Sequence, residues 1–140
     1  MKRIISIIIA LLLAINLATV TMAQETAEDP VQLRYVGMAS GSATLASSGN
    51  TLQLAANIVP WDGYYGKITI DLQERNGYSG TWYVKDTYTA SGAYNKNCVL
   101  YQEVTGTPGH SYRGYCKFET YNSSGNLVDQ KYGYTTILYL

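Results

Sequence analysis

The feature that most constrains the fold of this chain is an alternation of apolar and polar residues with a period of two. In TLQLAANIV (51–59) every second residue is Leu, Leu, Ala or Ile, and KITIDLQ (67–73) repeats the pattern with Ile, Ile and Leu. Side chains of a strand point alternately to opposite faces, so both segments predict strands with one buried face. After residue 23 the sequence shows no amphipathic helix pattern and no internal repeat.

Further segments of this kind follow to the end of the chain, separated by stretches rich in Gly, Asn and Ser. One of these stretches, ERNGYSG (74–80), contains Asn-Gly, which is a strong hairpin signal. The predicted strands are 31–36, 51–59, 67–73, 81–90, 98–105, 111–121 and, roughly, 127–137. Short strands joined by turns predict an all-β fold, an antiparallel β-sandwich of about seven strands.

The first 23 residues are typical of a secretory signal peptide. Lys2 and Arg3 precede an apolar run at 4–18, and Thr21 and Ala23 place small residues where a signal peptidase cleaves. We therefore expect cleavage before Gln24, a secreted, extracellular protein and no membrane insertion after cleavage. The expected organisation is a signal peptide at 1–23, a flexible acidic segment at 24–30 and one β-sandwich domain at 31–140.

The charge of the processed chain argues against a nucleic-acid partner. Loss of Lys2 and Arg3 leaves eight basic against ten acidic residues, a formal net charge of −2. The remaining Lys and Arg residues are spread singly along the sequence, whereas binding to a phosphate backbone depends on clustered positive charge.

Two cysteines in a secreted chain predict one disulfide, between Cys98 and Cys116. The bridge would close a loop of 17 intervening residues and would stabilise the fold by about 3 kcal/mol in the chain-entropy model. Alternation supports the pairing, because Cys116 shares a face with the apolar Phe118 while the charged residues between 113 and 119 share the other. Cys98 shares a face with Leu100. Both cysteines are therefore expected to point into the core.

The stretch GTPGHSYRGYCKFETYNSSGN (106–126) resembles a fibronectin type III pattern of a Pro-Gly turn, a strand that opens with Tyr and an Asn/Ser/Gly hairpin. Tyr112 follows the turn, as does the tyrosine-corner residue of immunoglobulin-like and fibronectin type III-like domains. The resemblance implies an immunoglobulin/fibronectin type III-like sandwich in which Tyr112 bonds back to the backbone.

A second resemblance covers the whole processed chain. LRY at 33–35, the SSGN turn, KITIDLQ, GTWYVKDTYTASG and SYRGYCKFETYNSSGN together resemble a family of small secreted proteins of unknown function from clostridia-type bacteria. This resemblance implies secretion and a β-sandwich. It carries over no catalytic residues.

No constellation in the sequence predicts catalysis, a cofactor or a metal ion. Cys116 and His110 resemble a nucleophile and its base, but alternation buries Cys116 and leaves His110 in a turn. The carboxylates of Asp71 and Glu74, and those of Glu103 and Glu119, are expected to face solvent rather than to converge across a cleft. One His and a bridged cysteine pair do not supply a zinc site. We therefore expect a non-enzymatic protein without cofactors or bound metal.

Tyrosine dominates the aromatic residues, with fourteen Tyr against one Phe. Tyrosine has a high β propensity, but it is also favoured on binding surfaces. The loop WDGYYG clusters Trp61, Tyr64 and Tyr65, which are the predicted ligand-binding residues, although Trp61 could instead fold under as a lid on the core. We expect a binding module for a protein or carbohydrate. The alternative is a structural or assembly protein at the cell surface that pairs through edge strands.

Overall fold

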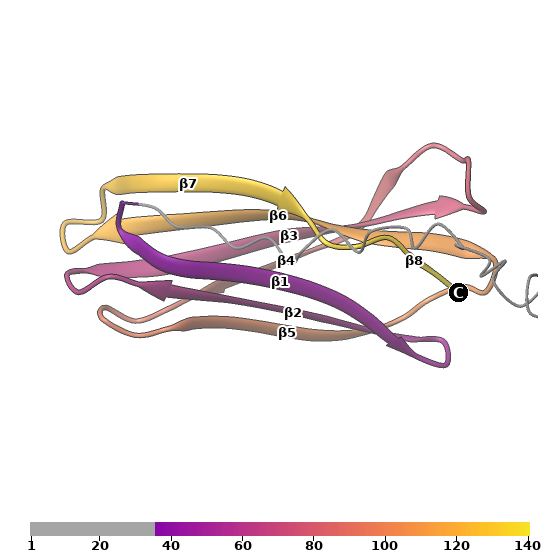
Figure 1. The fold of residues 1–140 in the computed structure, drawn as a ribbon, viewed down its shortest axis with the longest axis horizontal. Helices are drawn as coiled ribbons and strands as arrows, with labels where there is room; N and C mark the ends of the chain where they lie inside the picture. The colour runs from indigo at the N-terminus through magenta and orange to yellow at the C-terminus, as the bar shows by residue number, and fades with distance from the viewer. Residues whose placement is uncertain (1–35) are drawn as a thin grey trace, which may run out of the picture.

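The computed structural model describes residues 36–140, which form two packed antiparallel sheets with no helix in that range (Figure 1). Sheet A has the order β1-β2-β5: β1 (Met38–Ser48), β2 (Thr51–Pro60) and β5 (Cys98–Thr105). Sheet B has the order β4-β3-β6-β7: β4 (Tyr83–Ser91), β3 (Tyr64–Asn76), β6 (His110–Asn122) and β7 (Leu127–Tyr134); β8 (Leu138–Tyr139) also pairs with β6. The antiparallel β-sandwich is confirmed, with eight strands rather than about seven.

The predicted signal peptide at 1–23, the predicted flexible segment at 24–30 and most of the predicted strand at 31–36 lie outside the described residues. Within 36–140, no helix is long and apolar enough to cross a membrane. The first described strand, β1, lies where the sequence predicted none. The apolar–polar alternation of β1 is hard to recognise in the sequence, because many of its residues are small and a bulge lies between Met38 and Ser40. Gly41 faces inward, where Met38 and Phe118 occupy the space that a side chain would need.

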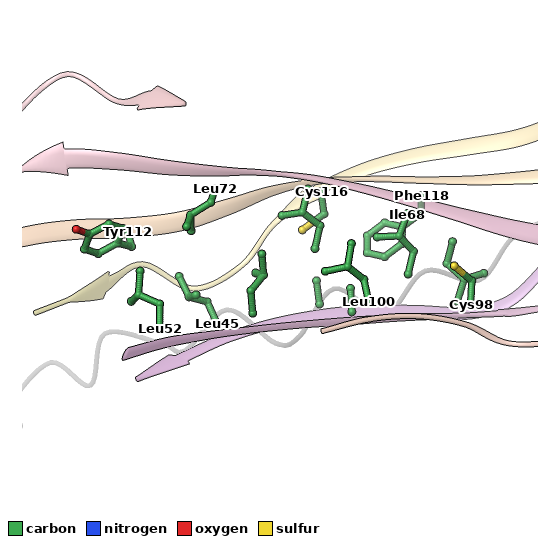
Figure 2. Packing of buried hydrophobic residues seen from close by; sticks show 14 of the residues in the cluster. Leu45, Leu52, Ile68, Leu72, Cys98, Leu100, Tyr112, Cys116 and Phe118 are labelled. Carbon is green, nitrogen blue, oxygen red and sulfur yellow. The ribbon is translucent and has the colours of Figure 1, made fainter. Parts of the chain in front are cut away.

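The core lies between the sheets and follows the predicted alternation. Leu52, Leu54 and Ile58 of β2 face Ile68 and Ile70 of β3, and all five are fully buried. Figure 2 shows side chains from both sheets meeting in one layer. Burial of this apolar surface is the main force that holds the two sheets together.

The predicted disulfide between Cys98 and Cys116 is not formed, and both residues are buried free thiols. Cys98 packs beside Gly66, whereas Cys116 pairs in register with Ile70 of the same strand, β3. Four residues along a strand correspond to roughly 13 Å, whereas the Cα atoms of a disulfide lie within about 7 Å of each other. Figure 2 shows Ile68 and Phe118 between the two cysteines. Alternation gave the correct face for each cysteine but not its position along the core.

The predicted last strand, at 127–137, is divided into β7 and β8. The break is at Thr135, whose N–H donates to the carbonyl of Gly114 at 2.9 Å and whose hydroxyl accepts the N–H of Gly114 at 2.8 Å. Beyond β8, Leu140 donates to the carbonyl of His110 and accepts from Gly109, at 3.0 and 2.6 Å. These bonds hold the end of the chain against the turn that precedes β6.

Candidate functional site: the outer face of sheet B

The three predicted loop residues do not share one surface. Trp61 lies in the turn between β2 and β3 with 55% of its surface exposed. Tyr64 and Tyr65 are the first residues of β3 rather than loop residues, and both are half-buried. Successive strand residues point to opposite faces, so the two tyrosines diverge. The ring of Tyr65 stacks on Tyr121 of β6, with centroids 5.3 Å apart.

The turn that carries Trp61 is fixed by the loop between β4 and β5. The side-chain carbonyl of Asn95 accepts the N–H of Gly63 at 2.7 Å, and the N–H of Asn95 donates to the carbonyl of Tyr64 at 2.9 Å. Both Asn95 and Gly63 have positive φ angles, 58° and 93°. The shape of this turn is therefore set by its hydrogen bonds to Asn95.

A larger aromatic cluster lies on the outer face of sheet B. It is a continuous row of six side chains drawn from β3, from the residue before β4, from β6 and from β7; we call it the aromatic–arginine row. Its members in order are Arg75, Trp82, Arg113, Tyr134, Tyr115 and Tyr132.

Two guanidinium groups hold one end of the aromatic–arginine row. The Cζ of Arg75 is 4.5 Å from the centroid of Trp82, and that of Arg113 is 4.3 Å from the same ring. Arg113 is also 4.3 Å from the centroid of Tyr134. Cation–π contacts of this kind each contribute about 0.5–1 kcal/mol at exposed sites. Arg113 therefore links Trp82 to Tyr134, and Arg75 adds a second cation to Trp82.

Tyrosines continue the row across β6 and β7. Tyr115 pairs in register with Tyr134, and their ring centroids are 4.9 Å apart. Tyr115 also stacks on Tyr132, at 5.8 Å with an interplanar angle of 11°. These rings turn faces towards one another, while Tyr132 and Tyr134 keep 49% and 44% of their surfaces exposed. The row therefore presents solvent with ring edges and hydroxyl groups more than with open ring faces.

The positive charge of the row is not balanced by a carboxylate within residues 36–140. Neither Arg75 nor Arg113 forms an ion pair there, and Nε of Arg113 donates to Oε1 of Gln73 at 2.8 Å. The carboxylate of Asp71, which is in register with Tyr115 on this face, accepts the hydroxyl of Thr87 at 2.6 Å. The buried Nε of Arg75 has no hydrogen-bond partner in the described part of the chain. The row therefore carries, at its Trp82 end, two arginines without an ion-pair partner among residues 36–140.

A second polar cluster lies inside the same end of the sandwich and centres on Glu74. The sequence predicted an outward carboxylate there, but β3 runs on to Asn76 and Glu74 keeps the inward parity of Ile70 and Leu72, with only 4% exposure. Its carboxylate accepts the hydroxyl of Tyr112 and, at 3.2 Å, the ammonium of Lys85. The expectation of a solvated Glu74 was wrong because the turn begins later than predicted.

The hydroxyl of Tyr112 also accepts the backbone N–H of Thr107 at 2.7 Å, five residues upstream, which is the contact that a tyrosine corner makes. His110 places Nδ1 2.9 Å from Oε1 of Glu74 without the alignment of a hydrogen bond. Burial alone would raise the pKa of Glu74, but hydrogen bonds from Tyr112, Lys85 and Tyr83 outweigh it and lower the pKa below its ordinary value. Glu74 is therefore a buried anion held by its neighbours.

The structure does not bring Cys116 and His110 together. They are six residues apart on β6, roughly 20 Å along the strand. Burial raises the pKa of Cys116 to about 12, so its sulfur stays a protonated thiol. Glu119 lies on the outer face as predicted but is buried beside Lys117, at 3.2 Å, rather than solvated.

Comparison with protein-family models, with curated proteins and with solved structures finds no match to this chain. Within the described residues, no group of three or more His, Cys, Asp and Glu side chains is placed to hold a metal ion. The aromatic–arginine row is the candidate functional site. Part of it could have been found from the sequence, because Arg113 and Tyr115 alternate outward on one strand and Tyr132 and Tyr134 on the next.

Proposed function

We propose that the protein is a small, secreted, non-enzymatic binding module that holds a carbohydrate or protein ligand on the outer face of sheet B. The observation that carries this proposal is the aromatic–arginine row, six side chains in contact across four segments of one sheet. Tyr, Trp and Arg are the residues most enriched at the energetic centres of binding interfaces.

The row is held in place before any ligand arrives. Arg113 is fixed by Gln73 on the neighbouring strand and by two rings, and Tyr115 lies between Tyr132 and Tyr134. Binding to side chains that are already ordered avoids a cost of about 0.5–1.5 kcal/mol for each side chain otherwise immobilised. A preformed row on a rigid sheet is therefore better suited to binding than Trp61, which stands in a turn apart from Tyr65.

The test is a screen of the protein against arrays of glycans, cell-wall polymers and mucosal proteins. Replacement of both Tyr132 and Tyr134 by Ala should abolish capture of any ligand found, while the far-UV circular dichroism stays unchanged. The matched control replaces Val99 and Tyr101 of β5, exposed residues on the outer face of sheet A, and should bind normally. Equal loss in both double variants, or in neither, contradicts the proposal.

Assembly through edge strands is the second candidate. The edge strand β4 exposes Tyr83 and Val84, and the edge strand β5 exposes Val99 and Tyr101. Exposed apolar residues on an unpaired edge favour pairing with another chain. Sedimentation velocity over a wide range of protein concentration should show reversible oligomers if this function holds. A monomer at the highest concentration would contradict it.

A further inference from the structure

We infer that the ligand of the aromatic–arginine row is an acidic polysaccharide, a polymer with carboxylates and hydroxyls along its chain. The inference rests on the proposed function and specifies the ligand for the same face. It begins from the two arginines, whose positive charge no carboxylate within residues 36–140 neutralises by an ion pair.

Nearby carboxylates are already engaged by other groups. Glu74 points into the sandwich, where Lys85 and Tyr112 bind it. On the outer face, Asp71 accepts the hydroxyl of Thr87, and Glu119 pairs with Lys117. Within residues 36–140, no carboxylate therefore forms an ion pair with the arginines in place of a ligand anion.

The geometry of Arg113 favours recognition of an anion by the edge of the guanidinium group. Trp82 and Tyr134 lie against the group, and Nε is used by Gln73. The terminal amino groups remain, and a planar guanidinium matches a carboxylate through two parallel hydrogen bonds. Arg75, on the same indole ring, supplies a second cation.

Neutral sugars fit this face less well. A neutral sugar binds an aromatic surface chiefly by lying on an open ring face, as in other stacking contacts. In the row the rings of Tyr115, Tyr132 and Tyr134 turn faces to one another, and Trp82 turns to the arginines. The exposed edges offer hydrogen bonds to the tyrosine hydroxyls and ionic contacts with the guanidinium groups.

The order of the row favours a polysaccharide over an acidic peptide. Guanidinium groups occupy one end, and the rings of three tyrosines continue the row from them across β6 and β7. A uronic-acid polymer offers carboxylates to the guanidinium groups and hydroxyls to the tyrosines along the same chain. An acidic peptide offers carboxylates and backbone amides, but no series of hydroxyls along its chain.

The test compares binding of the full chain, after any signal cleavage, to polygalacturonate, to its methyl ester and to polyglutamate. The ester removes the charge but keeps the sugar chain, and polyglutamate keeps the charge but lacks the sugar. We expect binding to polygalacturonate alone. Equal binding to the ester would overturn the anionic ligand, equal binding to polyglutamate would overturn the polysaccharide, and no binding to polygalacturonate would overturn both.

Arg113→Gln should weaken binding to polygalacturonate by about tenfold to a hundredfold, the effect of losing a charge-assisted hydrogen bond. Lys67→Gln is the matched control, because Lys67 of β3 carries the same charge on the same face of sheet B but lies opposite Glu119. It should leave binding unchanged, and equal losses in both variants would overturn the inference. If Arg113→Gln does not fold, as judged by near-UV circular dichroism, Arg75→Gln takes its place.

Two outcomes distinguish failure of this inference from failure of the proposed function. If a neutral polymer or a protein is captured and the Tyr132 and Tyr134 double variant releases it, the face binds but the ligand is not an acidic polysaccharide. If no captured ligand depends on that pair, the proposed function fails as well.

Discussion

Glu74 is the buried residue that connects Tyr112 of β6 with Lys85 of β4. Its carboxylate is almost fully buried, yet it bonds to Tyr112 and Lys85 and lies beside His110. A buried charge is tolerated only when it is paired and hydrogen-bonded, and removal of one partner leaves the others unsatisfied. Glu74 therefore fixes both the tyrosine corner and the position of β4.

Replacement of Glu74 by Gln should destabilise the protein by about 1–3 kcal/mol, because Lys85 and Tyr112 lose a charged partner. Urea unfolding at pH 7 measures the loss. Glu103→Gln is a suitable control, since Glu103 makes similar contacts to Tyr101 and Gln53 but is exposed, and it should give no measurable change. Equal stability of the two variants would contradict the role given to Glu74.

The same residue predicts a dependence of stability on pH. The folded pKa of Glu74 lies below its ordinary value of 4.5, so the unfolded chain takes up this proton at a higher pH than the folded protein. The contribution of Glu74 is therefore fully present above about pH 5 and is lost as the pH falls through the folded pKa. Thermal unfolding from pH 7 to pH 3 should show a smaller decline for Glu74→Gln than for the wild type. Parallel curves would contradict this assignment.

Both cysteines should behave as inert thiols. Burial raises the pKa of Cys116 to about 12, and Cys98 is equally inaccessible. We expect no labelling by a thiol reagent in the native protein, and labelling of both cysteines in urea without any reductant. A requirement for reductant in urea would show a disulfide and contradict the structure.

At the scale of elements, the last strand and the turn before β6 depend on one another. Gly106 is buried, and a Cβ there would lie 2.2 Å from Cδ1 of Leu140 and 3.3 Å from Leu52 and Tyr112. Tyr139, the residue before Leu140, stacks its ring on that of Tyr78, with centroids 4.2 Å apart. The end of the chain therefore closes the core at the same pole as the tyrosine corner.

Gly106→Ala should destabilise the protein by about 1–3 kcal/mol, the usual cost of overpacking. Because the closest atom belongs to Leu140, the added methyl group should cost much less in a Leu140→Ala background. A double-mutant cycle followed by urea unfolding measures this coupling. Additive effects of the two substitutions would show that Leu140 does not occupy the space beside Gly106.

Alternation predicted the buried faces of β2 and β3 because it depends only on the strand period. It could also have placed Glu74 inward, since Glu74 continues the series of Ile70 and Leu72. The aromatic–arginine row was not predictable in the same way. Its contacts depend on the register between β3, β4, β6 and β7, and on bulges at Leu72/Gln73 and Thr120/Tyr121, which no local pattern shows.

For the whole molecule, one core shared by two sheets predicts one cooperative unfolding transition. The buried residues of sheet A and sheet B form a single cluster, so neither sheet keeps a buried face without the other. Near-UV and far-UV circular dichroism should lose signal at the same urea concentration. Separate midpoints would show that one sheet survives alone.

The two free thiols bear on when and where this chain folds. A small secreted domain that depends on a disulfide reaches its native state only where an oxidant is present. This sandwich closes without a disulfide within residues 36–140, so a reducing compartment does not hold it unfolded. If the chain is exported unfolded, its translocation must be faster than its folding. A reducing environment would not delay that folding, because no disulfide has to form first.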